Sequence, residues 1–287
     1  MSKTLPRKKI FEWHVTFVVE GSTFPSLPKS IDDECILERL EGEKLRDEST
    51  AILVVKVYRE SIPSDEECNK VEKAAYEKAQ LIADFYSLFV GQMRVMGCSS
   101  ITQVTPYKGQ AIFHQSIQCR IKIKLNDHVW SEKAKPLSET KTLNPQPYVS
   151  LALAHYGLAL WQELNLKFLN LMISIEALYN SNPQELSYRI SHRVANLLGR
   201  TEKDRQRIFK EIHDFYVKRN VLVHGLNPVN ISEDDVERLR RYSKCSLLIF
   251  LRLGQKKDKI LNEVDEAIYD EAARQKIQEK VKDIIEH

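Results

Sequence analysis

The sequence predicts a protein of mixed α+β class, in which a β-rich module precedes an all-α helical bundle. Two observations support this division. Stretches rich in β-branched and aromatic residues, which are typical of strands, are confined to residues 1–130. From about residue 148 onward the apolar residues follow helical spacing, and capping residues punctuate the pattern.

The first module, residues 1–130, is predicted to contain about five strands around one long helix. The clearest strand signals are three alternating stretches: 13–19, 51–58 and 111–125. The helix is expected over 64–93, where alanines and aliphatic residues recur at helical spacing. The sequence does not show what this module does; a sensor or a partner-binding domain, for an unknown ligand or protein, fits its position.

A polar, proline-containing stretch at 131–147 is the predicted linker, and residues 148–287 form the second domain. Capping signals divide this domain into about five helices. Their expected limits, in order, are Val149–Tyr179, a second helix ending at Gly199, a third opened by Thr201 and Asp204, a fourth opened by Ser232 and Asp235 and ending near Gly254, and a fifth over Lys257–Ile285.

Composition and charge restrict the possible functions. The chain has 43 basic and 40 acidic residues, a net charge of +3 that permits nucleic-acid binding without requiring it. Its apolar runs are far shorter than the roughly 20 residues that span a bilayer, so no membrane contact is expected. Five scattered cysteines without a CxxC pair favour a reducing cytoplasm.

Several common catalytic motifs are missing from the sequence. The nine glycines form neither a dinucleotide-binding nor a P-loop pattern, and no HExxH sequence occurs. The eight histidines never pair at metal-ligand spacing. We therefore expect no cofactor and no metal.

Two charged residues fall on apolar helix faces. The stripe Ile208, Ile212 and Phe215 continues onto Arg219, and the stripe Leu166, Leu169 and Ile173 continues onto Glu176. Charges at such positions need partners. One interpretation is a buried Glu176–Arg219 pair that ties two helices together; the other is a functional site.

His224 lies five residues after Arg219, which on an ideal helix turns it roughly 140° away. The two side chains can converge in one of two ways. The helix breaks after Arg219, or two copies of the chain meet at a symmetric interface. The alternative is that His224 is an ordinary core histidine beside aliphatic residues.

Taken together, these residues resemble a known motif. "RNVLVH" at 219–224 fits the R-[N/D/H]-x-x-x-H signature of the HEPN superfamily (higher eukaryotes and prokaryotes nucleotide-binding). The preceding segments "FLNLMISIEALYN" (168–180) and "YRISHRVANLLG" (188–199) resemble its Apea-like branch in order and spacing. The resemblance covers roughly residues 148–255.

The resemblance implies a metal-independent endoribonuclease that cleaves single-stranded RNA through attack of the 2′-hydroxyl, in defence or toxin-like RNA degradation. Arg219 would stabilise the phosphorane and His224 would transfer protons. Asn220 would position the phosphate or the histidine, Glu176 would orient Arg219, and Tyr216 would line the cleft. The family also implies a homodimer whose Arg–His pairs meet at the interface.

Two other functions remain open. One is a non-catalytic HEPN module that binds RNA or nucleotide. The other is a structural helical dimerisation domain in which the motif is incidental. A closed core around Arg219 and Glu176, with His224 turned away, would favour the structural function.

Overall fold

The computed structural model divides the chain into two compact units, Met1–Leu143 and Asn144–His287. We call them the N-terminal unit and the helical unit. The structure describes these residues: 11–21, 29–32, 35–39, 50–59, 65–89, 93–104, 111–116, 145–181, 186–225 and 229–282. The predicted α+β class is confirmed, because the described part of the first unit is a sheet with a helix and that of the second is helical.

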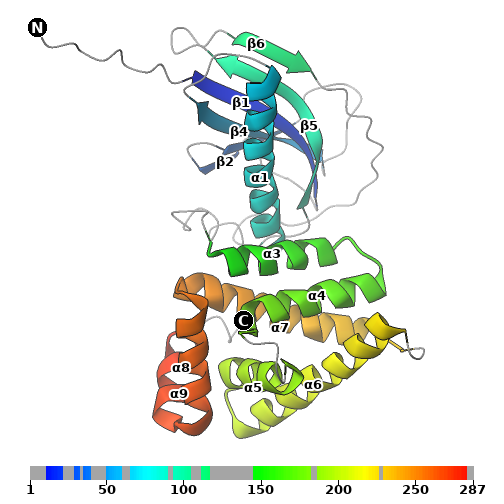
Figure 1. Cartoon of the computed structure of the whole chain (residues 1–287), viewed down its shortest axis with the longest axis vertical. Coiled ribbons are helices and arrows are strands. Elements are labelled where there is room, and N and C mark those ends of the chain that lie inside the picture. The colour runs from blue at the N-terminus through cyan, green and yellow to red at the C-terminus, as the bar shows by residue number, and fades with distance from the viewer. Residues whose placement is uncertain are drawn as a thin grey trace, which may run out of the picture. The chain divides into compact units, whose positions relative to one another are not determined.

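The N-terminal unit contains a six-stranded antiparallel sheet in the order β2-β3-β4-β1-β5-β6. Its strands are β1 (Phe11–Gly21), β2 (Lys29–Asp32), β3 (Cys35–Arg39), β4 (Thr50–Arg59), β5 (Met93–Val104) and β6 (Ala111–Ser116). Helix α1 (Asp65–Phe89) contacts β1, β4 and β5 and crosses one face of the sheet (Figure 1).

The core of this unit lies between α1 and the sheet. Alternate residues of the central strand β1 are fully buried, as the period of a strand requires: Trp13, Val15, Phe17 and Val19. The facing side of α1 buries small and aliphatic residues, among them Val71, Ala75 and Ala79. Small side chains let the helix approach the sheet closely while the aromatic residues of β1 fill the space.

The sequence prediction of this unit was partly wrong. The helix ends at Phe89 rather than at residue 93, and Met93 already begins strand β5. Strand β5 carries Gly97 and two serines, and its pairing with β1 shifts register twice, so its apolar alternation is weak in the sequence. The third predicted strand begins at Ala111 as expected, and positions 117–125 lie outside the described residues.

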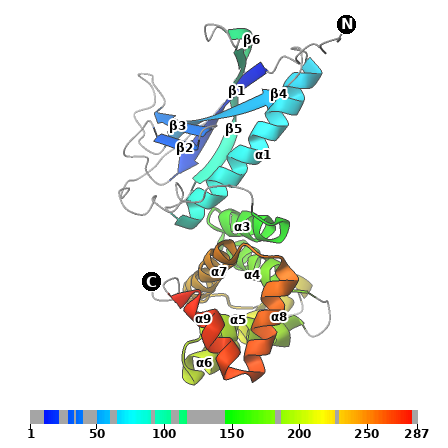
Figure 2. The same cartoon turned by 90° about the vertical axis from the view of Figure 1, so that its left-hand side faces the viewer.

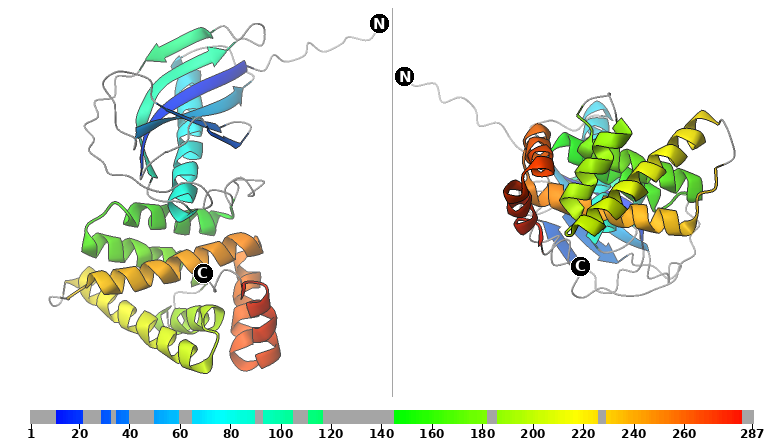
Figure 3. Two further views of the ribbon diagram at one scale, coloured as in Figure 1. Left: turned by 180° about the vertical axis from the view of Figure 1, so that it is seen from behind. Right: turned by 90° about the horizontal axis from the view of Figure 1, so that it is seen from below.

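The described helices of the second unit are α3 (Pro147–Ala159), α4 (Leu164–Tyr179), α5 (Leu186–Leu198), α6 (Glu202–His224), α7 (Glu233–Leu253), α8 (Lys257–Tyr269) and α9 (Glu271–Glu279). Helix α4 contacts α3, α5, α6 and α7, and so forms the centre of the bundle (Figures 1 and 3). Helices α8 and α9 pack against each other along one side (Figure 2).

Two predicted helices are each divided in the structure. The expected helix 149–179 ends at Ala159 and resumes at Leu164, with short-range bonds from Leu160 N to Gly157 O (3.2 Å) and from Trp161 N to Leu158 O (3.1 Å). The break lets α3 fold back along α4. The expected fifth helix is interrupted at Asp270, whose extended backbone and side chain cap the next helix by accepting from Ala272 N (2.8 Å).

The other caps of the bundle agree with the sequence prediction. Thr201 and Asp204 form a reciprocal capping box at the start of α6, as do Ser232 and Asp235 at the start of α7. Gly254 ends α7 in the left-handed conformation, with φ of 57°.

A buried arginine joins three helices of the bundle. Arg193 of α5 is only 3% exposed. Its guanidinium donates to both carboxylate oxygens of Asp265 on α8 (2.7 and 2.6 Å) and to the Tyr179 carbonyl at the end of α4 (2.6 Å). Because this arginine is fully occupied, we assign it a structural role.

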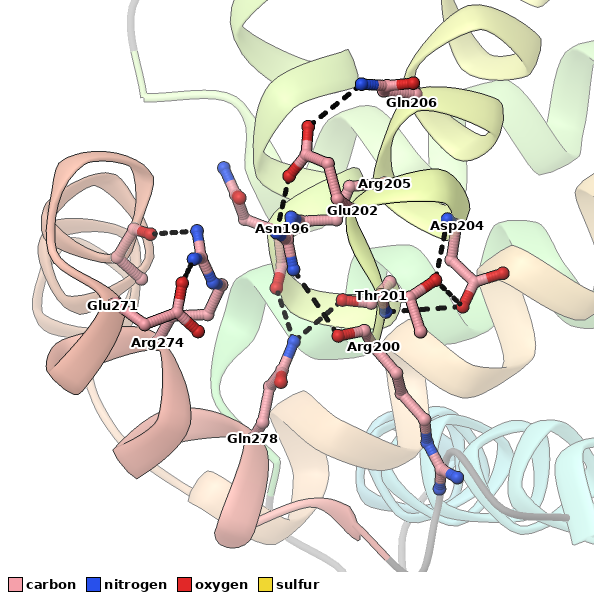
Figure 4. Close-up of polar contacts among 12 residues, drawn as sticks. Asn196, Arg200, Thr201, Glu202, Asp204, Arg205, Gln206, Glu271, Arg274 and Gln278 are labelled. Atoms are coloured by element: carbon pink, nitrogen blue, oxygen red, sulfur yellow. Dashed lines mark hydrogen bonds and ion pairs between the residues drawn. The ribbon is translucent and has the colours of Figure 1, made fainter.

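A second polar network fixes the turn between α5 and α6 against α9 (Figure 4). Gln278 of α9 donates to the Gly199 carbonyl (2.7 Å), while Arg205 pairs with Glu202 and Arg274 pairs with Glu271. Glycine is needed at position 199 because the end of α5 and the start of α6 approach each other closely there. A Cβ there would lie 2.7 Å from both the Ala195 carbonyl oxygen and Cγ of Arg205.

Candidate functional site

The RNxxxH motif occupies the last turn and a half of α6. The helix continues without interruption to His224, and Gly225 ends it in the left-handed conformation (φ 62°), donating its N–H to Val221 O (3.0 Å). A helix break after Arg219, one of the two ways to bring the motif together, is therefore ruled out. Arg219 and His224 of one chain point to different sides of one helix.

Arg219 pairs with Glu176 of α4, as the sequence predicts. Its Nε lies 3.4 Å from Glu176 Oε1, and its Nη1 donates to Asn220 Oδ1 at 3.3 Å. The two side chains remain 28% and 20% exposed, so the pair is not sealed in a closed core. Partly exposed pairs at such distances contribute about 1 kcal/mol or less to stability. The Arg219 side chain therefore has a defined partner and remains partly open to solvent.

Tyr216 lies behind this pair, one helical turn before Asn220, and is 3% exposed. Burial, and then the neighbouring Glu176 carboxylate, raise the pKa of its hydroxyl far above the usual range. The hydroxyl does not meet the geometry of a hydrogen bond to that carboxylate or to any other described group. A phenol with so high a pKa stays neutral, which suits a wall of the site and not a proton-transfer group.

Asn220 and His224 are exposed. His224 is the last residue of α6, and its ring is not part of the core, so the ordinary core histidine considered from the sequence is ruled out. The structure thus brings Arg219, Glu176, Tyr216 and Asn220 together and leaves His224 on a different side of the helix from Arg219.

The apolar stripes around the site differ from the prediction in one respect. Ile208, Ile212 and Phe215 are buried as expected. On α4, however, Leu166 is 50% exposed, and Leu169 and Ile173 are only partly buried, so Glu176 does not continue a core stripe. The buried face of α4 is formed instead by other apolar residues of this helix: Phe168, Leu171, Met172, Ile175 and Leu178.

One ion pair near the motif was not predicted. Lys218 Nζ donates to Asp235 Oδ2 (2.6 Å), which joins α6 to the start of α7. Burial alone would raise the pKa of Asp235, but hydrogen bonds from Lys218 and Ser232 lower it to about 2. The pair closes the connection between α6 and α7 and thereby positions the end of α6. The Ser232–Asp235 capping box was visible in the sequence, but its lysine partner 17 residues earlier was not.

Several arginines of α6 and α7 form ion pairs with side chains of their own helix. Arg205, Arg207, Arg238 and Arg240 pair with acidic residues three or four positions away on the same helix. They are therefore partly neutralised and form a weaker positive surface than their number suggests.

Among the described residues, no three His, Cys, Asp or Glu side chains gather closely enough to hold a metal ion. Within the same ranges, no helix combines the length and the apolar character needed to cross a bilayer.

No family model, no curated protein and no solved structure matches this chain. The resemblance to the HEPN superfamily therefore rests on the residues of the chain and remains a prediction.

Proposed function

We propose that the helical unit is a metal-independent HEPN endoribonuclease that cleaves single-stranded RNA. The observation that supports this best is the combination of contacts and solvent exposure at Arg219. The guanidinium contacts Glu176 and Asn220, and the Arg219 side chain is more than a quarter exposed, within the part of α6 that carries the motif. A purely structural arginine of this bundle, Arg193, is 3% exposed and has all its partners inside.

In the proposed reaction, the 2′-hydroxyl of RNA attacks the adjacent phosphorus, the bond to the 5′-oxygen breaks, and a 2′,3′-cyclic phosphate forms. His224 removes the proton of the attacking hydroxyl or returns one to the leaving oxygen. Arg219 stabilises the charge that develops on the phosphorane, through the two-pronged contact that a guanidinium makes with phosphate. Asn220 orients the phosphate, and Tyr216 forms a wall of the site.

The unbroken helix supports a homodimer as the active form. Because Arg219 and His224 point to different sides of α6, an Arg–His pair would have to form between two copies. Two aliphatic side chains within or just before the motif are more than half exposed: Val217 by 53% and Val223 by 51%. Burying them against a second copy would favour association.

The Glu176–Arg219 ion pair also favours a second candidate, a helical dimerisation module in which the arginine ties α6 to α4. Binding of RNA or nucleotide without cleavage belongs to the same alternative. Under either function, we propose a cytoplasmic protein whose N-terminal unit senses a ligand or binds a protein partner, in a defence system. Cys245 is a free thiol, as a reducing compartment would leave it.

The test is an incubation of the purified chain with mixed RNAs in EDTA, followed by analysis of the product ends. We expect cyclic phosphate ends, and no cleavage of RNA whose 2′-hydroxyls are methylated. Arg219→Ala and His224→Ala should each slow cleavage roughly a hundred- to a thousandfold, the loss that removal of one positioned group causes. Arg241→Ala, which removes another exposed arginine, is the matched control and should cleave normally.

Two results would reject the ribonuclease. If His224→Ala cleaves at the normal rate, the histidine has no part in the reaction. If Arg219→Ala unfolds the helical unit, the arginine is a structural tether and the second candidate holds.

A further inference from the structure

Four rings gather between α5 and α6, away from the residues of the motif. Tyr188 and His192 come from α5, and Phe209 and His213 come from α6. The ring centroids of Tyr188 and His192 lie 4.5 Å apart, those of His192 and Phe209 4.6 Å, and those of Tyr188 and Phe209 5.7 Å. Phe209 and His213 are nearly parallel, with 8° between their planes. We call these four residues the ring platform.

The ring platform is not part of the core. Tyr188 is 55% exposed, and the other three rings are only partly buried. Burial lowers the pKa of His192, so its imidazole is neutral at neutral pH and presents an aromatic face. Tyr188 thus leaves an aromatic face open to solvent beside three further rings, and another planar ring could stack there.

The ring platform shares one side of α6 with two residues of the motif, Asn220 and His224. Phe209, His213, Asn220 and His224 stand at positions 0, 4, 11 and 15 of the same unbroken helix. At 100° per residue they fall within about 60° of arc, and from first to last they span about 22 Å along the axis. A single strand that reaches His224 along this side of the helix would therefore pass over the rings.

We propose that the ring platform is a base-stacking subsite for single-stranded RNA, which holds the strand a few nucleotides away from the motif. This inference rests on the ribonuclease function proposed above. Aromatic side chains bind bases of any identity, because every base has a stacking face. One charged residue directly follows each of three rings: Arg189 follows Tyr188, the exposed Lys210 follows Phe209 and Asp214 follows His213. Each is turned about 100° from the ring before it, so two basic residues and one acidic residue border the ring platform.

The experiment measures binding of two fluorescein-labelled single strands of equal length to the whole chain, by fluorescence anisotropy. Both carry 2′-O-methyl groups, so they cannot be cleaved, and one of them lacks its bases. Tyr188→Ala should weaken binding of the base-bearing strand roughly five- to a hundredfold, as the loss of one base–aromatic stack does. It should leave binding of the abasic strand unchanged.

Two variants test whether a loss of binding in Tyr188→Ala is due to the loss of the ring. Tyr188→Phe retains the ring and should bind like the wild type. Tyr269→Ala removes a tyrosine of α8 that is 92% exposed, and it should have no effect. Because Tyr188 is more than half exposed, its replacement should leave the circular dichroism spectrum and the melting temperature unchanged.

Equal binding of the base-bearing strand by wild type and Tyr188→Ala would overturn the proposal, and so would equal weakening on both strands. A wild-type chain that binds neither strand would overturn it as well. Cleavage of all-ribose RNA, measured in parallel, judges the ribonuclease separately. If the chain cleaves RNA but Tyr188→Ala binds the strands like the wild type, only the ring platform is rejected. If binding depends on Tyr188 but no RNA is cleaved, only the ribonuclease function is rejected.

Discussion

The Arg219 guanidinium has two described neighbours, the Glu176 carboxylate and the Asn220 amide, and neither covers it. An arginine that only joined two helices would gain most from burial and from a bidentate pair, as Arg193 shows in the same unit. Arg219 instead makes two long contacts, 3.4 Å to Glu176 and 3.3 Å to Asn220, and its side chain stays partly exposed. This geometry suits a residue that binds an anion.

Gly225 controls the end of the helix that carries His224. Its φ of 62° is strained for a residue with a side chain, although an added Cβ would meet no atom within 4 Å. We expect Gly225→Ala to destabilise the helical unit by about 1 kcal/mol and to loosen the last turn of α6. Gly225→Asn should cost less, because asparagine adopts this conformation more readily. Hydrogen exchange of the last turn of α6 measures the difference, and equal exchange in wild type and Gly225→Ala would contradict the prediction.

The Arg219–Glu176 contact was one of the interpretations drawn from the sequence. The stripe that leads to Arg219 is buried as predicted, whereas the stripe that leads to Glu176 is partly exposed. The sequence could not reveal that His224 lies on another side of an unbroken helix, since a break and a continuous helix fit "RNVLVH" equally well. The ring platform escaped prediction because its rings come from two helices. The spacing of Tyr188 to His192 and of Phe209 to His213, four residues each, was the signal that could have indicated it.

Among the elements, helix ends with caps were predictable and helix breaks without them were not. Thr201, Ser232 and Gly254 mark the ends of α6 and α7 by side chain or backbone preference. No glycine or proline lies between the end of α3 at Ala159 and the start of α4 at Leu164, although Gly157 lies in the last turn of α3. The break at Asp270 had a weak signal, because aspartate is a common N-cap residue.

The ion pair that joins Arg193 of α5 to Asp265 of α8 can be tested by mutation. Replacing Arg193 with Met keeps the volume but leaves the Tyr179 carbonyl and the Asp265 carboxylate without their donor. We expect the helical unit to lose about 1–3 kcal/mol of unfolding free energy, because the Tyr179 carbonyl loses a charged donor while Asp265, which is 37% exposed, can still be solvated. Hydrogen exchange should rise in α5 and α8, while α1 of the N-terminal unit serves as the internal control. An unchanged exchange pattern in α5 would show that the buried pair is dispensable.

For the molecule as a whole, the sequence separated a β-rich region from a helical one, and the division at Leu143 and Asn144 lies within the predicted linker. It underestimated the sheet, since β2, β3 and β5 are short or interrupted by glycine and serine. The homodimer and the sensing role of the N-terminal unit remain predictions. The dimer has the stronger physical basis, because one unbroken α6 cannot bring its own arginine and histidine together.

The most direct test of a shared site is complementation between two inactive chains. Arg219→Ala and His224→Ala chains with different tags are produced together, and their heterodimer is purified and assayed for RNA cleavage in EDTA. In a two-fold dimer one of the two Arg–His pairs between copies is then intact, so the heterodimer should recover roughly half of the wild-type rate. Each variant alone should stay roughly a hundred- to a thousandfold slower. A heterodimer as slow as its two parents would contradict an active site formed between copies.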